Sequence, residues 1–226
     1  MKFARSMFVR VSIIPLVLAA GPVTSSATQV EVLGTIPAAA TQQLQASVAM
    51  PSVSVAQIAR DQLIADGADL NAGHYVWRPE LAPSGAVEIV VSLPQQRAYI
   101  YRANTLIGIT TVSTGRAGHR TPTGRFPIME KHREHYSSIY DGAPMPFMQR
   151  LTNGGIALHA GEIPNYPASH GCVRLPYAMA QNLFGVTQVR TVVHIVNAAP
   201  TALTALQVAR GERPAMPMEE PVRGTR

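Results

Sequence analysis

Two stretches decide how this chain folds: Gly155-Ile156-Ala157-Leu158-His159 and Ser169-His170-Gly171-Cys172-Val173-Arg174-Leu175. Cys172 is the chain's only cysteine, and His159 precedes it by thirteen residues. A thiol attacks only as the thiolate, and a nearby imidazole can take its proton. Because a single cysteine cannot form a disulfide within the chain, we interpret Cys172 as a nucleophile and His159 as its base.

The residues before Cys172 predict a tight turn that delivers the thiol to the start of a helix. The first amides of a helix have no partner, so they lower the pKa of a nearby thiol. Gly171 permits backbone conformations that other residues avoid. The amides of His170, Gly171 and Cys172 are therefore candidates to receive an oxyanion, and we expect Ser169 to help shape the site.

The region around these motifs has mainly β character. Its apolar, β-branched runs are separated by turn signals, of which Thr121-Pro122-Thr123-Gly124 is the clearest. We expect strands at Val87–Leu93, Ala98–Arg102, Leu106–Ser113, Phe126–Met129, Gly155–His159 and Thr191–Val196. One short helix is expected after the cysteine, at Tyr177–Phe184, with Pro176 in its first turn.

The stretch from His132 to Leu151 has no clear period and contains Tyr140, Met145 and Phe147. A loop of this length inside a compact domain is typical of a lid or a binding loop. The alternative is a hairpin whose aromatic residues belong to the core, and the sequence leaves both readings open.

The N-terminus has the order of a secretory signal. Lys2, Arg5 and Arg10 precede the apolar run at 11–20, and small residues at 25–27 offer a cleavage site before Thr28. The apolar run is too short to span a bilayer comfortably, although an uncleaved membrane anchor stays open as an alternative. We therefore expect export to the periplasm or cell wall, with no stable membrane span after cleavage.

The charge of the chain argues against nucleic acid as a partner. The 19 Lys and Arg residues outnumber 13 Asp and Glu residues, and three cations but no acids lie in the predicted signal. Its removal leaves 16 cations against 13 acids, a formal charge of about +3. No basic stripe with interleaved aromatic residues is visible, so this mild charge suits an anionic envelope polymer instead.

The sequence predicts four parts. Residues 1–27 form the signal peptide, and residues 28–85 form a linker with a short helix near 55–65. Residues 86–197 form one domain of ordinary size, and we expect it to be monomeric. Residues 198–226 end in a charged, Pro-rich stretch that predicts a disordered tail.

The motifs resemble those of the L,D-transpeptidase catalytic domain, the YkuD family. The resemblance rests on His159, on the run from Ser169 to Leu175, and on the segment Thr121-Pro122-Thr123-Gly124-Arg125-Phe126. It covers about residues 87–196. It implies a mixed β-sandwich or barrel with one short helix after the catalytic cysteine and long loops at the active site.

The resemblance also implies a reaction on peptidoglycan. Relatives attack the carbonyl of the third stem residue, release D-alanine through a cysteine thioester, and transfer the acyl group to an amine to form a 3→3 cross-link. Water as acceptor would make the enzyme a carboxypeptidase or amidase, and an envelope protein is another possible acceptor. The alternative that is not an enzyme is a catalytically idle module that binds the cell wall.

Carried onto this chain, the resemblance assigns Cys172 as nucleophile and His159 as base. It places His170 at the site and lets the Ala160 carbonyl orient the His159 ring. Arg174 becomes either a structural residue or a contact for a substrate carboxylate, and we expect Tyr140, Met145 and Phe147 to line the substrate site.

No cofactor or metal is expected for this reaction. His159, His170 and Cys172 could instead bind zinc, although paired ligand spacing is missing. An unperturbed histidine base predicts that activity falls with an apparent midpoint around pH 6 to 7.

Overall fold

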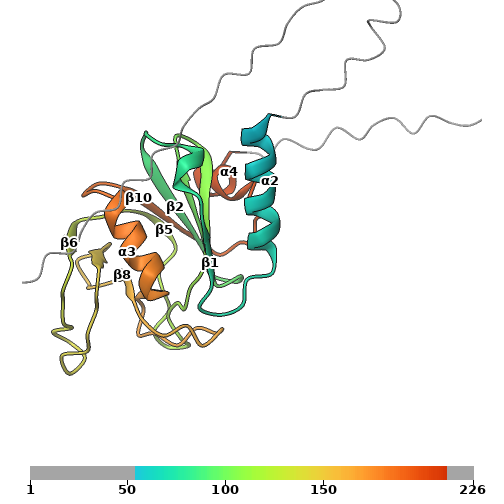
Figure 1. The fold of residues 1–226 in the computed structure, drawn as a ribbon. Coiled ribbons are helices and arrows are strands. Elements are labelled where there is room, and N and C mark those ends of the chain that lie inside the picture. The colour runs from blue at the N-terminus through green and yellow to red at the C-terminus, as the bar shows by residue number, and fades with distance from the viewer. Residues whose placement is uncertain (1–53, 213–226) are drawn as a thin grey trace, which may run out of the picture. The chain divides into compact units, whose positions relative to one another are not determined.

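The structure, a computed structural model, describes residues 54–212 (Figure 1). The predicted signal at 1–27 and the Pro-rich end of the predicted tail lie outside the described residues. The elements in chain order are α2 (Val55–Ala68), β1 (Tyr75–Trp77), the 3-10 turn η1 (Pro79–Leu81), β2 (Val87–Ser92), β3 (Arg97–Arg102), β4 (Thr105–Thr111), β5 (Gly124–Pro127), β6 (Glu130–His132), β7 (Met148–Arg150), β8 (Ala157–Ala160), β9 (Val173–Leu175), α3 (Tyr177–Val186), β10 (Val192–Val196) and α4 (Ala205–Arg210).

The strands form two mixed sheets. The larger has the order β1-β4-β3-β2-β10-β5, and the smaller has the order β6-β7-β8-β9. Two pairs are parallel, β2 with β10 and β8 with β9, and the other pairs are antiparallel. The mainly β class expected from the sequence is confirmed.

The main core lies between the two sheets and α3. Alternate residues of the larger sheet, such as Ile89 and Ile100, meet Leu158 and Val173 of the smaller sheet and Leu183 of α3. Side chains alternate between the two faces of a strand, so these apolar positions define which face of each strand is covered. The smaller sheet is thereby fixed against a packed layer that cannot shift freely.

The opposite face of the larger sheet is covered by α2 and α4 (Figure 1). Leu63 of α2 and Leu206 of α4 belong to a second apolar cluster with Val90, Tyr99 and Ile109. Burial on both faces explains why β2 and β4 read as nearly continuous apolar runs. It also gives the larger sheet a rigid backing behind the main core.

The expected domain boundaries differ from the structure at both ends. Tyr75–Trp77 pairs with β4 in the sheet, within the stretch expected to be a linker, and α4 packs on β2 within the expected tail. Both elements are short, so their periodicity is weak, and only tertiary contacts stabilise them. The helix expected near 55–65 is confirmed as α2, which begins after Ser54, whose Oγ accepts a hydrogen bond from the Gln57 amide at 3.1 Å.

Among the helices within residues 54–212, none combines the length and apolar character needed to cross a bilayer.

Close packing of α2 on β4 gives a testable consequence. A Cβ added at Gly67 would collide with the side chain of Ile109. Gly67→Ala should therefore lower the free energy of unfolding by about 1–3 kcal/mol, the usual cost of overpacking. Gly185→Ala, in α3, is the matched control, because a Cβ there meets nothing within 4 Å. It should leave stability unchanged or raise it by about 0.5–1 kcal/mol.

The two variants are compared by urea denaturation. Equal stability of Gly67→Ala and Gly185→Ala would contradict the packing of α2 on the sheet.

Candidate active site

The parallel pairing of β8 and β9 brings the two predicted catalytic residues to one face. His159 lies opposite Arg174, and Leu158 lies opposite Val173. Leu158 and Val173 point into the main core. Alternation then turns His159 and Arg174 to the other face, and Cys172, two residues before Arg174, joins them there.

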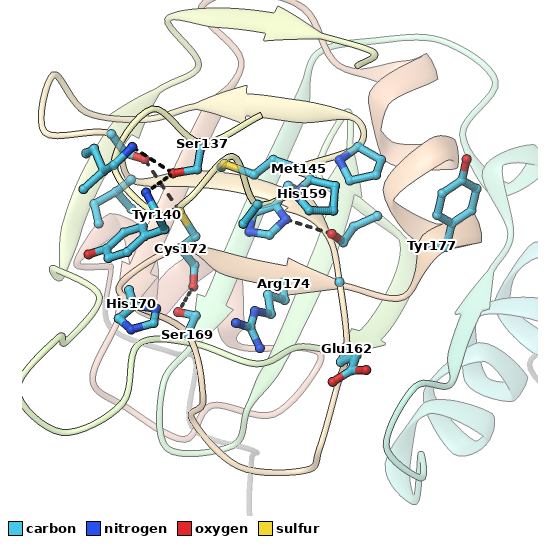
Figure 2. A pocket seen from close by; sticks show the side chains of 18 of the residues that line it. Ser137, Tyr140, Met145, His159, Glu162, Ser169, His170, Cys172, Arg174 and Tyr177 are labelled. Carbon is cyan, nitrogen blue, oxygen red and sulfur yellow. Dashed lines mark hydrogen bonds between the residues drawn. The ribbon is translucent and has the colours of Figure 1, made fainter. Parts of the chain in front are cut away.

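That face is the wall of a cavity of about 600 Å³ (Figure 2). Its lining includes eight residues that the sequence predicted for the site: Cys172, His159, His170, Ser169, Ala160, Arg174, Tyr140 and Met145. Gly171 and Phe147 were predicted for the site but do not line the cavity.

His159 is held in its neutral form. It is 8% exposed, and its Nδ1 donates a hydrogen bond to the Ala160 carbonyl at 2.8 Å. Burial lowers the pKa of His159 to about 4, an effect that the Ala160 carbonyl opposes and the positive charge of Arg174 reinforces. A proton on Nδ1 leaves Nε2 as the acceptor, so the ring can take a proton from a neighbouring group at neutral pH.

Cys172 rests as a thiol. Its Sγ donates a hydrogen bond to the Gly155 carbonyl at 3.6 Å, and burial raises its pKa against opposing effects of the Ala157 amide and Arg174. Within residues 54–212, no hydrogen bond joins this sulfur to His159. The thiol must therefore leave the Gly155 carbonyl before it can give its proton to the ring.

The predicted position of Cys172 at a helix start is wrong. Cys172 is followed by β9, and α3 begins only at Tyr177, after Pro176. Val173 and Leu175 are buried in the core, and this alternation favours a strand directly after the cysteine. The amides at the start of α3 therefore do not lower the pKa of Cys172, which burial raises instead.

The turn before Cys172 is fixed by its own hydrogen bonds. Ser169 Oγ donates to the Cys172 carbonyl at 2.5 Å and accepts from the Gly171 amide at 3.0 Å. Gly171 has φ +118°, and a Cβ there would lie 2.6 Å from Cδ1 of Ile156. Only glycine fits this position without strain.

The Gly171 amide donates to Ser169, so the predicted oxyanion donors reduce to two. The amides of His170 and Cys172 make no hydrogen bond with any residue in the described range. Both residues line the cavity, so their amides remain the candidate oxyanion donors.

Thr121 ties the Thr-Pro-Thr-Gly turn to this loop. Its Oγ1 donates to the Gly171 carbonyl at 2.8 Å and accepts from the Gly115 amide at 2.8 Å. Thr121 is 4% exposed, so both bonds are shielded from water. The sequence predicted only a turn here, because the contact spans fifty residues of chain.

His170 lies at the rim of the cavity. Its Nε2 accepts a hydrogen bond from Arg116 at 2.8 Å, and its ring stacks on Tyr140 with centroids 4.4 Å apart. His119 meets the same ring edge-on at 4.9 Å. With Nε2 bonded to Arg116, His170 does not serve as the thiol's base in this geometry; it joins the cysteine turn to the loop that carries Tyr140 (Figure 2).

Comparison with known proteins identifies the family. Residues 86–195 match the family model of the L,D-transpeptidase catalytic domain, YkuD. This segment belongs to that family.

Solved structures of L,D-transpeptidases are similar to the chain. One from Stackebrandtia nassauensis is 24% identical with a TM-score of 0.47, covering 72% of this chain and 78% of that one. One from Xylanimonas cellulosilytica is 26% identical with a TM-score of 0.46, covering 50% and 61%. One from Mycobacterium smegmatis is 18% identical with a TM-score of 0.46, covering 50% and 59%. The chain thus spans less than two thirds of the length of several of these structures. A search of curated proteins found no match.

The long loop of the L,D-transpeptidase domain combines both readings left open by the sequence. It connects β6 to β7 as a hairpin, and Met145, Phe147 and Met148 at its second end are buried. Its outer part carries Tyr140 to the cavity. The loop is therefore anchored in the core at one end and forms a wall of the site at the other.

Phe147 was expected to contact substrate, and the structure corrects this. It is 4% exposed and packs on Tyr177 and Phe184, with ring centroids 5.3 and 5.8 Å away. Its apolar ring is more stable in the core than at the rim, where Tyr140 keeps a polar hydroxyl. Phe147 therefore anchors the loop by packing against α3 in the core.

Sequence reasoning missed Glu162, Ile139 and Tyr177, which line the cavity. Glu162 follows β8 closely, and its position three residues after His159 was the one available signal. Tyr177 belongs to the predicted helix, but only the tertiary arrangement turns it to the site.

The zinc alternative finds no support in the arrangement of its three candidate ligands. Among the described residues, no three His, Cys, Asp or Glu side chains are grouped to hold a metal ion.

The ionisation of His159 corrects the pH dependence expected from an unperturbed histidine. Because burial favours the neutral ring, its protonation should be centred near pH 4 instead of 6 to 7. Above that pH the ring can accept a proton, and below it this capacity is lost. NMR titration of the ring protons measures this directly, with His159→Gln used to assign the signal. A midpoint near 6.5 would contradict the burial.

The Thr121 contacts predict a stability effect. Thr121→Val leaves the Gly115 amide and the Gly171 carbonyl without their partner, at a cost of about 1–3 kcal/mol. Thr123→Val is the control, because Thr123 is exposed and makes no side-chain hydrogen bond within residues 54–212. Urea denaturation should separate the two variants, and equal midpoints would show that Thr121 does not hold the turn.

Proposed function

We propose that this protein is a peptidoglycan L,D-transpeptidase that acts through a thioester on Cys172. The observation that carries the proposal is the placement of His159 on β8 and of Cys172 directly before the adjacent parallel strand β9, where both residues line one cavity. Membership of residues 86–195 in the L,D-transpeptidase family supports the same assignment.

The first half-reaction forms the thioester. Neutral His159 takes the thiol proton at Nε2 as Sγ attacks the carbonyl carbon of the third residue of a stem tetrapeptide. The amides of His170 and Cys172 stabilise the oxyanion. The His159 ring then gives its proton to the departing nitrogen, and D-alanine leaves.

The second half-reaction transfers the acyl group to an amine. The amine of a second stem attacks the thioester, and His159 takes a proton from its nitrogen. The C–S bond breaks with its electron pair on sulfur, and His159 passes that proton to Sγ. The product carries a 3→3 cross-link. Arg174 is suited to a stem carboxylate, and Tyr140 and Met145 form the walls against which the donor lies.

The location follows from this substrate. We propose that residues 1–27 direct export and that the catalytic domain works in the periplasm or cell wall. Peptidoglycan stems, with an envelope protein as a possible further acceptor, are the proposed partners.

Product analysis tests the reaction. Incubation with a disaccharide-tetrapeptide should release D-alanine and yield a cross-linked dimer, and Cys172→Ala should yield neither. Tripeptide without dimer would make the enzyme a carboxypeptidase. No turnover by the wild-type protein would favour an idle wall-binding module.

The role of His159 predicts a kinetic effect. His159→Gln should slow acylation of Cys172 by roughly 10²–10⁴-fold, the usual contribution of a general base. Quenched-flow mass spectrometry measures the rate, and His74→Gln, an exposed histidine that does not line the cavity, is the control. An acylation rate in His159→Gln equal to that of the control would remove His159 from the mechanism.

A further inference from the structure

A second cavity, of about 870 Å³, shares no lining residue with the active cavity. His194 on β10 lies opposite Val90, a member of the apolar cluster beneath α2 and α4, so the two side chains point to the same face of the larger sheet. Arg125 on β5 lies opposite His194 and points the same way. Arg210 of α4 also lines the cavity. The second cavity therefore lies beside α4, on the face of the larger sheet away from the main core.

The lining of the second cavity carries more positive than negative charge. Arg125, Arg190 and Arg210 contribute guanidinium groups. Glu88 is the one acidic residue of the lining in the described part of the chain, and Arg210 Nη2 donates to its Oε1 while His194 Nε2 donates to its Oε2 at 3.0 Å. Arg125 and Arg190 form no ion pair within residues 54–212. Two positive charges are thus left without a counter-charge in that range.

The pairing of β5 with β10 holds both of these arginines at the cavity. Arg125 lies within β5. Arg190 lies just before β10, and its amide donates to the Ile128 carbonyl at 2.8 Å. Its φ is 76°, in the left-handed region that few residues other than glycine and asparagine adopt. Because these backbone contacts fix the two positions without using either guanidinium, both side chains remain available to a ligand.

The charge and size of the second cavity indicate the class of ligand. A ligand with no charge or one charge leaves at least one of the two guanidinium groups uncompensated. A phosphate monoester carries about 1.5–2 negative charges at neutral pH, and guanidinium groups bind its oxygens through charge-assisted hydrogen bonds. The cavity is larger than a phosphate group, and Gln188 and Thr191 add polar side chains to its lining. These side chains suit the hydroxyl groups of a sugar or polyol.

We propose that the cavity beside α4 is a second binding site, which takes the phosphate monoester of a sugar or polyol through Arg125 and Arg190. The active cavity lies on the face of the smaller sheet away from the main core, so the two sites are on opposite sides of that core. A ligand bound at the second site therefore attaches the domain to a phosphorylated component and leaves the active cavity open. This binding does not depend on the proposed transpeptidase reaction.

Isothermal titration calorimetry of the full chain with glycerol 3-phosphate tests the site. The wild-type protein should bind one equivalent and should not bind glycerol, which lacks the charge. Arg125→Gln and Arg190→Gln should each weaken binding about tenfold or more. Arg78→Gln is the matched control, because Arg78 is also exposed but lies outside this cavity, and it should bind as the wild-type protein does.

A second measurement needs no variant in the site. In the ¹⁵N NMR spectrum of the wild-type protein, glycerol 3-phosphate should shift amide signals of β5 and of residues 186–191 and leave that of Cys172 unchanged. Cys172→Ala should bind the ligand as tightly as the wild-type protein. Failure of the proposed enzymatic function would therefore leave this binding intact, and the two proposals can fail separately.

The phosphate monoester has two potential sources, a soluble sugar or polyol phosphate and a lipid headgroup. Vesicles that contain phosphatidic acid present the same group on a lipid. Cosedimentation with these vesicles that Arg125→Gln weakens would support the site and assign the phosphate to lipid. Binding of glycerol 3-phosphate without cosedimentation would support the site and assign it to a soluble phosphate. Binding of neither probe, or equal affinities of the two site variants and Arg78→Gln, would overturn the site.

Discussion

The parallel register between β8 and β9 is the constraint on which the site depends. It sets His159 opposite Arg174 while Leu158 and Val173 enter the core. A slip of one residue would turn the catalytic face of a strand inward and expose its apolar face. The core therefore fixes the active site, because the same two strands carry both, and the packing between the sheets penalises any other pairing.

Burial gives this site its resting state. Desolvation keeps His159 neutral and Cys172 protonated, so the two groups do not form an ion pair before substrate arrives. This differs from an activated cysteine at a helix start, which holds a stable thiolate. The thiol instead donates a hydrogen bond to the Gly155 carbonyl. In the proposed mechanism, its proton moves to His159 only when the acyl donor arrives. Such a resting thiol is also less exposed to oxidation than a standing thiolate.

The sequence predicted the longer strands because their β-branched runs are local signals. The strands expected near Val87, Ala98, Leu106 and Thr191 are present as β2, β3, β4 and β10, and the helix after the cysteine is present as α3. Strands of three residues, such as β1 and β6, have too few positions to show a period. They exist because a neighbouring strand pairs with them.

Within the site, the motifs gave Cys172 and His159, and the structure brings them to one cavity. Contacts that depend on distant segments could not be predicted. Thr121 reaches Gly171 across fifty residues, and Glu162 lines the cavity only because of the tertiary arrangement. Phe147 failed as a predicted substrate contact because an apolar ring in a long loop is as suited to the core as to a ligand.

The central claim is that the sulfur of Cys172 carries the acyl group. Intact-protein mass spectrometry after brief incubation with a tetrapeptide donor, followed by peptide mapping, tests it most directly. The account predicts a single adduct with the mass of the donor less D-alanine, located at Cys172 and released by hydroxylamine. An adduct on another residue, or turnover of the donor by Cys172→Ala, would contradict it.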